Sequence, residues 1–94
     1  MTARRALLLL NPRSRRGARA APAVFAALAQ HGFGVTTPPA GMPLADAIAR
    51  HAADADLVIA GGGDGTLNAV INALANGPGL SALPLGVVPL GTAN

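Results

Sequence analysis

The sequence contains no cysteine, no lysine, no tyrosine and no tryptophan, and these absences exclude several classes of site. Without cysteine there is neither a disulfide nor a thiolate metal site, so nothing indicates an oxidising compartment and a cytoplasmic setting is expected. Without lysine there is no Walker-type phosphate loop, which needs a lysine before its final Ser or Thr. The lack of tyrosine and tryptophan argues against RNA binding, where aromatic rings stack on bases.

Long apolar runs are also missing, because every apolar stretch is interrupted well before the roughly 18 residues that a membrane span needs. The opening imitates a signal peptide, with Arg4 and Arg5 before an apolar run, but that run stops at Asn11 and is too short. Residues 6–10 are therefore predicted to form a first strand. The protein is expected to be soluble or peripheral at a membrane.

The 94 residues suffice for one small domain, and the charge within it is uneven. Six of the seven arginines lie in the first 19 residues, whereas the remainder has one arginine and four aspartates. The basic residues are Arg4, Arg5, Arg13, Arg15, Arg16 and Arg19. The pI of about 11.6 therefore reflects one local segment. Such a segment is usually a solvated surface, and contact with an anionic membrane surface is the alternative, while nucleic acid is not an expected partner.

Four glycines within five positions stand between the apolar run 57–60 and a segment with helical spacing of apolar residues. A strand, a glycine turn and a helix N-terminus form a phosphate cradle, because backbone amides and the helix dipole favour an anion there. The turn does not match the dinucleotide fingerprint, since neither Gly61-x-Gly63 nor Gly63-x-Gly65 has Gly or Ala three residues later.

Asp64 is the unexpected residue of this turn, because a carboxylate repels a phosphate. It is accounted for if it binds Mg²⁺ or accepts the proton of a substrate hydroxyl, and the residues leave both roles open. The structural alternative is a capping or turn-stabilising role. His31 and His51 lie near the ends of predicted helices and, without a third ligand, do not indicate a metal site.

Strand and helix patterns alternate along the chain. Strands are predicted over 6–10, 33–36, 57–60 and 85–88, helices over about 22–31, 44–53 and 66–75, and loops over 11–17, 37–43 and 89–94. Continuous apolar strands need cover on both faces, so the predicted fold class is α/β, an open parallel sheet with helices on both faces. Ligands bind outside the carboxyl ends of such strands, where three polar loops converge: Asn11–Arg15, Gly61–Thr66 and Gly91–Asn94.

Three motifs taken together resemble the diacylglycerol kinase catalytic domain family, and within it the bacterial lipid kinases related to diacylglycerol, sphingosine and ceramide kinases. The motifs are Asn11-Pro12-Arg13-Ser14, Gly62-Gly63-Asp64-Gly65-Thr66-Leu67-Asn68 and Pro89-Leu90-Gly91-Thr92-Ala93-Asn94. They span the chain in order, and no single motif would be specific. The resemblance implies the nucleotide-binding part of an enzyme that transfers the γ-phosphate of ATP to a lipid hydroxyl with Mg²⁺.

The resemblance also implies which residues bind the nucleotide. The loop Asn11–Arg15 and Thr92 would contact it, and residues Gly62–Asn68 would cradle its phosphates. A threonine after the second strand belongs to the family's site as well; Thr37 fits best because Gly41 keeps the spacing to the next glycine, and Thr36 is the alternative. Asp64 would be the catalytic residue, as proton acceptor or as Mg²⁺ ligand.

Two features depart from the family pattern: Arg15 takes a glycine position in the first loop, and the sequence stops at Asn94. The family continues with an aspartate and a β-rich lipid-acceptor domain, so residues 1–94 are expected to be a partial ATP-binding domain. Because phosphoryl transfer depends on positioning, little kinase activity is expected of this part alone. The competing functions are an NAD kinase, which shares only the Gly-Gly-Asp-Gly-Thr turn, and a non-catalytic nucleotide- or anion-binding module.

Overall fold

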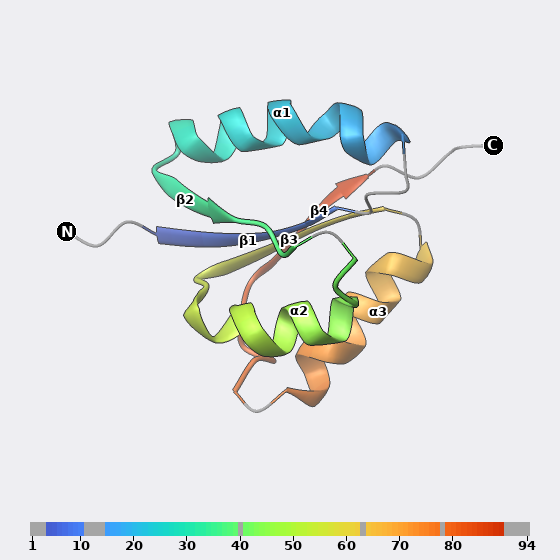
Figure 1. Cartoon of the computed structure of the whole chain (residues 1–94). Helices are drawn as coiled ribbons and strands as arrows, with labels where there is room; N and C mark the ends of the chain where they lie inside the picture. Colours follow the sequence, from blue (N-terminus) through green and yellow to red (C-terminus); the bar gives the residue numbers. More distant parts are fainter. Residues whose placement is uncertain (1–3, 11–14, 40, 63, 78, 90–94) are drawn as a thin grey trace.

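The computed structural model describes residues 4–10, 15–39, 41–62, 64–77 and 79–89 (Figure 1). Within these residues strands and helices alternate as predicted. In chain order they are β1 (Arg4–Leu10), α1 (Arg15–Gln30), β2 (Phe33–Thr36), α2 (Leu44–His51), the 3-10 turn η1 (Ala52–Asp54), β3 (Leu57–Gly62), α3 (Asp64–Asn76) and β4 (Leu85–Pro89).

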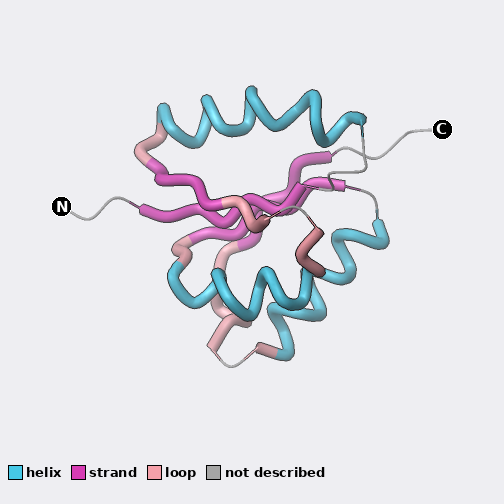
Figure 2. Tube along the Cα trace, viewed as in Figure 1, coloured by secondary structure: helices cyan, strands magenta, loops and turns pink. Residues whose placement is uncertain are grey.

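The four strands form one sheet in the order β2-β1-β3-β4, and all three neighbouring pairs are parallel. Helix α1 covers one face, while α2 and α3 cover the other (Figures 1 and 2). The predicted open parallel sheet with helices on both faces is therefore confirmed. After β1 the chain goes outward to β2 and then crosses back to β3, so the strand order reverses between β1 and β3. In open α/β sheets this switch point is where ligands bind.

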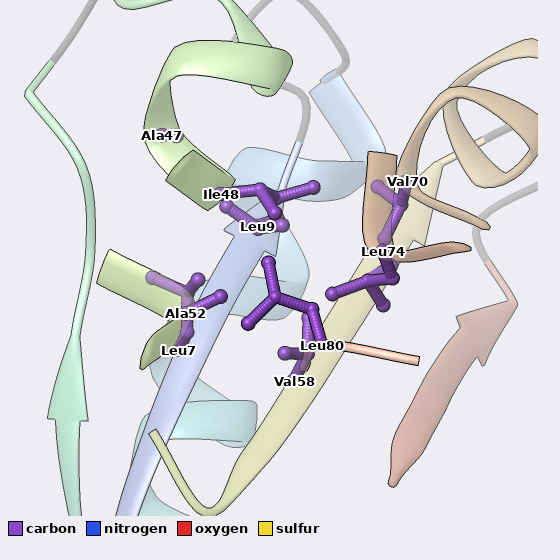
Figure 3. Packing of buried hydrophobic residues seen from close by; sticks show 10 residues of the cluster. Leu7, Leu9, Ala47, Ile48, Ala52, Val58, Val70, Leu74 and Leu80 are labelled. Carbon is purple, nitrogen blue, oxygen red and sulfur yellow. The ribbon is translucent and has the colours of Figure 1, made fainter. Parts of the chain in front are cut away.

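The larger part of the core lies between the sheet and helices α2 and α3 (Figure 3). Leu7 pairs with Val58 and Leu9 with Ala60, and because paired residues of a parallel sheet share a face, all four point to this side. They pack against Ile48, Ala52, Val70, Leu74 and Leu80.

The alternate residues of β1 point to the opposite face. Ala6 and Leu8 are almost completely buried there, on the side that α1 covers (Figure 1). Because both faces of β1 are covered, its apolar run has no polar interruption from Ala6 to Leu9.

Helix α1 begins at Arg15, earlier than the predicted start at Pro22, so the predicted loop over 11–17 is wrong for residues 15–17. Pro22 lies inside the helix. A proline is favourable in the first turn of a helix, which is why it suggested a start. The arginines and alanines before it are strong helix formers, and their propensity favours a helix that begins before Pro22.

The glycine turn is shorter than predicted, because Gly61 and Gly62 belong to β3 and α3 begins at Asp64, two residues before the predicted start at Thr66. Both glycines are paired within the sheet, with Val88 and Pro89 of β4. The backbone hydrogen bonds of the two neighbouring strands thus extend β3 through residues whose own strand propensity is low.

The other boundaries agree more closely. Strand β2 has the predicted bounds, β1 begins at Arg4 and β4 includes Pro89. Helix α2 has the predicted start but ends at His51, and the chain continues as η1, a 3-10 turn of the kind that often follows an α-helix.

Candidate nucleotide-binding site

The carboxyl ends of β1, β3 and β4 lie side by side at one edge of the sheet. Leu10, the last residue of β1, pairs with Gly61, and Gly62, the last residue of β3, pairs with Pro89 of β4. The polar loops predicted to converge leave the sheet from these three ends. Of their residues, Asn11, Pro12, Arg13, Ser14, Gly63, Gly91, Thr92, Ala93 and Asn94 lie outside the described part of the chain.

Gly62 ends β3 with a φ of +150°, a backbone conformation that residues with a side chain rarely adopt. A Cβ atom at Gly62 would lie 3.0 Å from the Cβ of Thr66 and 3.1 Å from its Oγ1. The last residue of the strand and the first turn of α3 therefore pack so closely that a methyl group here would require Thr66 to move by a few tenths of an ångström. At this position the positive φ favours glycine.

Helix α3 starts only two residues after β3 ends, so its N-terminus lies at the switch point. Its first turn consists of Asp64, Gly65, Thr66 and Leu67. The backbone amides of a first helical turn have no acceptors within the helix, and the helix dipole places partial positive charge on them. Apart from its own helix backbone and chain neighbours, no described residue has an atom within 4 Å of a Cβ added at Gly65, so the described residues leave the space beside this turn open. This arrangement fits a phosphate group.

The remaining residues of the predicted cradle have different environments. The side chain of Leu67 is partly buried and packs against the core, so a ligand contact from this residue would come from its backbone. Asn68 is exposed on α3. The structure thus divides the motif into a glycine that makes the turn, residues that begin the helix and a leucine that anchors the helix to the sheet.

Thr36 is the last residue of β2, and Thr37 follows it; both are exposed. Thr36 pairs with Leu7, three residues before the end of β1, which is roughly 10 Å along a strand. Strand β1 separates β2 from β3. The sheet therefore does not bring Thr37 next to the glycine turn. In the loop that follows Thr37, Gly41 has a φ of +86° and forms a turn.

Among the described residues there is no group of three or more His, Asp, Glu or Cys side chains that could hold a metal ion. The backbone of the described part does fit a phosphate ligand, at the strongly turned end of β3 and the first turn of α3. Asp64, the first residue of α3, is the acidic residue of this turn.

A model of the diacylglycerol kinase catalytic domain matches residues 5–94. The chain belongs to this family. The resemblance drawn from the three motifs is thereby confirmed, and with it the assignment of the chain to a family of lipid kinases.

Three relatives illustrate the relationship. A diacylglycerol kinase of Staphylococcus saprophyticus is 36% identical over 96 residues, which cover 97% of this chain and 31% of that protein. A diacylglycerol kinase of Staphylococcus haemolyticus is 51% identical over 41 residues, covering 44% of this chain and 12% of the relative. A probable lipid kinase YegS-like protein of Pectobacterium atrosepticum is 62% identical over 40 residues, covering 43% and 13%.

This member of the diacylglycerol kinase family thus spans about a third or less of the length of these relatives, with 31% as the largest share. None of the helices in its described part is long and apolar enough to cross a membrane.

Proposed function

We propose that residues 1–94 form the ATP-binding part of a lipid kinase that transfers the γ-phosphate of ATP to a hydroxyl of diacylglycerol or a related lipid. The proposal rests on family membership and on one structural observation. At the switch point of the sheet, β3 ends at a glycine with positive φ and α3 begins two residues later. The β-rich lipid-acceptor domain would follow in the whole enzyme.

In this proposal the first-turn amides of α3 donate hydrogen bonds to the phosphate oxygens of ATP. The loop Asn11–Arg15 and Thr92 contact the nucleotide, and Thr37 adds a contact from the loop after β2. Bound Mg²⁺ would neutralise charge on the phosphates. Asp64 holds this ion or accepts the proton of the lipid hydroxyl. Since phosphoryl transfer depends on positioning, both substrates must be held in line by the whole enzyme.

The acceptor is a membrane lipid, so the enzyme must approach a membrane surface. The basic segment at the start of the chain would contact anionic headgroups there, since residues 1–45 contain no acidic residue. The described members Arg4, Arg5 and Arg19 are exposed.

Calorimetric titration of the folded chain with Mg-ATP tests the nucleotide site. The chain is expected to bind. Asp64→Asn should weaken binding about tenfold in the presence of Mg²⁺, because the ion loses a ligand, and should not weaken it without Mg²⁺, where the carboxylate only repels the phosphates. Binding that is not weakened in the presence of Mg²⁺ would assign the proton-accepting role instead. Asp46→Asn, on the exposed first turn of α2, is the matched control and should behave as the parent chain. Absence of binding by a chain that circular dichroism shows to be folded would contradict the proposed site.

A kinase assay tests the reaction. The whole protein is supplied with ATP, Mg²⁺ and either diacylglycerol in mixed micelles or NAD. We expect phosphorylated lipid only. Phosphorylated NAD without a lipid product would establish the competing NAD kinase function.

A further inference from the structure

The two edge strands of the described sheet, β2 and β4, carry different residues on the face that α2 and α3 cover. Thr36 of β2 pairs with Leu7, and Val87 of β4 pairs with Ala60. Because paired residues of a parallel sheet share a face, both edge residues point to this side. Thr36 is exposed and polar, which suits contact with water. Val87 is apolar, yet it is 52% exposed beside the buried Ala60.

Strand β4 has the composition of an interior strand. Its sequence, Leu-Gly-Val-Val-Pro, is apolar on both faces, as in parallel strands that are covered on both sides. Helix α1 packs mainly on β1 and β2, and α3 packs mainly on β3. Val88, which points to the face opposite Val87, is therefore also only partly buried. The position of β4 at the edge of the sheet does not match its residues.

The backbone of β4 has hydrogen-bonding groups on its outer side. The N–H of Val58 in β3 donates to the carbonyl oxygen of Pro84 at 3.0 Å. Along a parallel strand, residues whose backbone groups face one neighbour alternate with residues whose groups face the other side. The even-numbered residues therefore face β3, whereas the N–H and C=O groups of Leu85 and Val87 point away from it. No described strand lies on that side.

No charge protects this edge. Residues 65–94 contain no charged side chain, whereas the first 64 residues contain all seven arginines and all four aspartates. Folded proteins commonly place charges on an exposed edge strand to prevent pairing. Helix α3, within the uncharged stretch, also exposes Ile71 to 45%. Depletion of charge is typical of the buried centre of an interface, so this side of the molecule has the composition of a covered surface.

Three kinds of partner do not fit this surface. An anionic membrane and a nucleic acid are bound by basic side chains, which the stretch lacks. A second copy would place its own β4 against this one. Pairing edge to edge leaves Val87 uncovered in both copies, because the face of a sheet is covered only by an element that packs on it.

A further part of the same protein fits better, since it can supply both a strand and the elements that cover its faces. The relatives have enough chain for this. The match that covers 97% of this chain covers 31% of a diacylglycerol kinase, so more than two thirds of that relative lies outside the matched part.

We propose that β4 is an interior strand of the whole protein and that a fifth strand, from the part of the protein outside residues 1–94, pairs with its outer edge. The fifth strand accepts hydrogen bonds from the N–H groups of Leu85 and Val87 and donates to their carbonyl oxygens. Elements attached to it cover Val87 and Ile71. The proposal rests on the described sheet and on the length of the relatives, and it does not depend on the kinase activity.

Amide hydrogen exchange at single-residue resolution tests the pairing in the whole gene product. The N–H groups of Leu85 and Val87 should exchange about as slowly as that of Gly86, which faces β3. In residues 1–94 alone, the same two groups should exchange at least about a hundredfold faster than that of Gly86, because they have no partner strand.

Two variants of the whole gene product test the covered face and do not require the shorter chain to be folded. Val87→Lys would bury an unpaired charge beneath the covering elements, so it should raise the exchange rate of the Leu85 amide by about a hundredfold. Ala26→Lys, on the exposed side of α1, adds the same charge and should leave that rate unchanged.

Three results would overturn the proposal. Fast exchange at Leu85 and Val87 in the whole gene product would show that β4 remains an edge strand. Equal effects of Val87→Lys and Ala26→Lys on the Leu85 amide would show that nothing covers this face. Slow exchange at Leu85 in residues 1–94 alone that disappears on dilution would identify a second copy as the partner.

Discussion

At the scale of single residues, Gly62 and Gly65 belong to one motif but have different physical roles. Gly62 has a positive φ and lies against Thr66, whereas Gly65 lies within α3, where the described residues leave room for a Cβ. Sequence alone shows three glycines before an aspartate and one after it. Backbone conformation and the positions of neighbouring atoms distinguish them, and both depend on how α3 is placed against β3.

Alanine substitutions at these two glycines should therefore have opposite effects on stability. Gly62→Ala should lower the free energy of unfolding by about 1–3 kcal/mol, because the new methyl group meets Thr66 and the backbone is strained. Gly65→Ala should raise it by roughly 0.5 kcal/mol, because alanine is the better helix former. Urea unfolding followed by circular dichroism measures both.

The same two variants test whether stability and ligand binding change independently. Gly65→Ala should weaken Mg-ATP binding although the protein is more stable, because the added methyl group occupies the open side of the phosphate turn. Unchanged affinity in Gly65→Ala would show that phosphate does not approach this turn. Equal stability of the two variants would contradict the assignment of strain to Gly62.

At the scale of secondary-structure elements, helices α1 and α2 carry arginines at opposite ends. The first turn of α1 contains Arg15 and Arg16 and no acidic residue, while the last turn of α2 contains Arg50. A positive charge is unfavourable at a helix N-terminus and favourable at a C-terminus. The same charge reversal should thus have opposite effects in the two helices.

Arg16→Glu should raise the free energy of unfolding by roughly 0.5 kcal/mol at low salt, and Arg50→Glu should lower it by a similar amount. Both variants change the net charge equally, so each controls for the other. The difference should largely disappear at 1 M salt, where electrostatic interactions are screened within about 3 Å. Urea titrations at both salt concentrations measure it, and effects of the same sign would contradict the helix-dipole explanation.

Arg16→Glu also tests the proposed membrane contact. Binding to vesicles that contain phosphatidylglycerol should weaken more in Arg16→Glu than in Arg50→Glu, because Arg16 belongs to the basic segment and Arg50 does not. Equal loss in both variants would indicate that only net charge matters.

The element boundaries show where local sequence patterns suffice. The bounds of β2 and the start of α2 follow from apolar spacing and from the proline- and glycine-rich loop between them, and both predictions are confirmed. The predicted start of α1 and the predicted end of β3 are wrong. Pro22 and Gly61 are local signals for a boundary, but the helix-forming residues before Pro22 and the pairing of β3 with β4 extend these elements past them.

At the scale of the whole molecule, a long-range pair of hydrogen bonds joins the start of β1 to the segment before β3. The backbone N–H of Arg5 donates to Oδ2 of Asp56 at 2.9 Å, and the backbone N–H of Asp56 donates to the carbonyl oxygen of Arg5 at 2.8 Å. The second bond continues the β1–β3 pairing by one residue beyond Ala6 and Leu57. Asp56 thereby holds the register that aligns Leu10 with Gly61 at the opposite edge.

Asp56→Ala should lower the free energy of unfolding by about 1 kcal/mol, because the Arg5 amide loses its acceptor. Asp56→Asn is the matched control, since its side-chain oxygen can still accept this bond, and it should cost less than half as much. Chemical denaturation measures the change, and amide exchange at Arg5 locates it. Equal losses in the two variants would show that the charge of Asp56 matters, not its bond to the backbone.

The sequence by itself determined the α/β class, the glycine turn with Asp64 and the family, because alternation, apolar spacing and motif order are properties of the chain read in one direction. Only the tertiary structure decided the strand order β2-β1-β3-β4, which places the ends of β1 and β3 side by side. It also decided that residues as far apart as Arg5 and Asp54 line one pocket. Strand order and pocket composition depend on packing between distant segments, and no local pattern encodes which faces will meet.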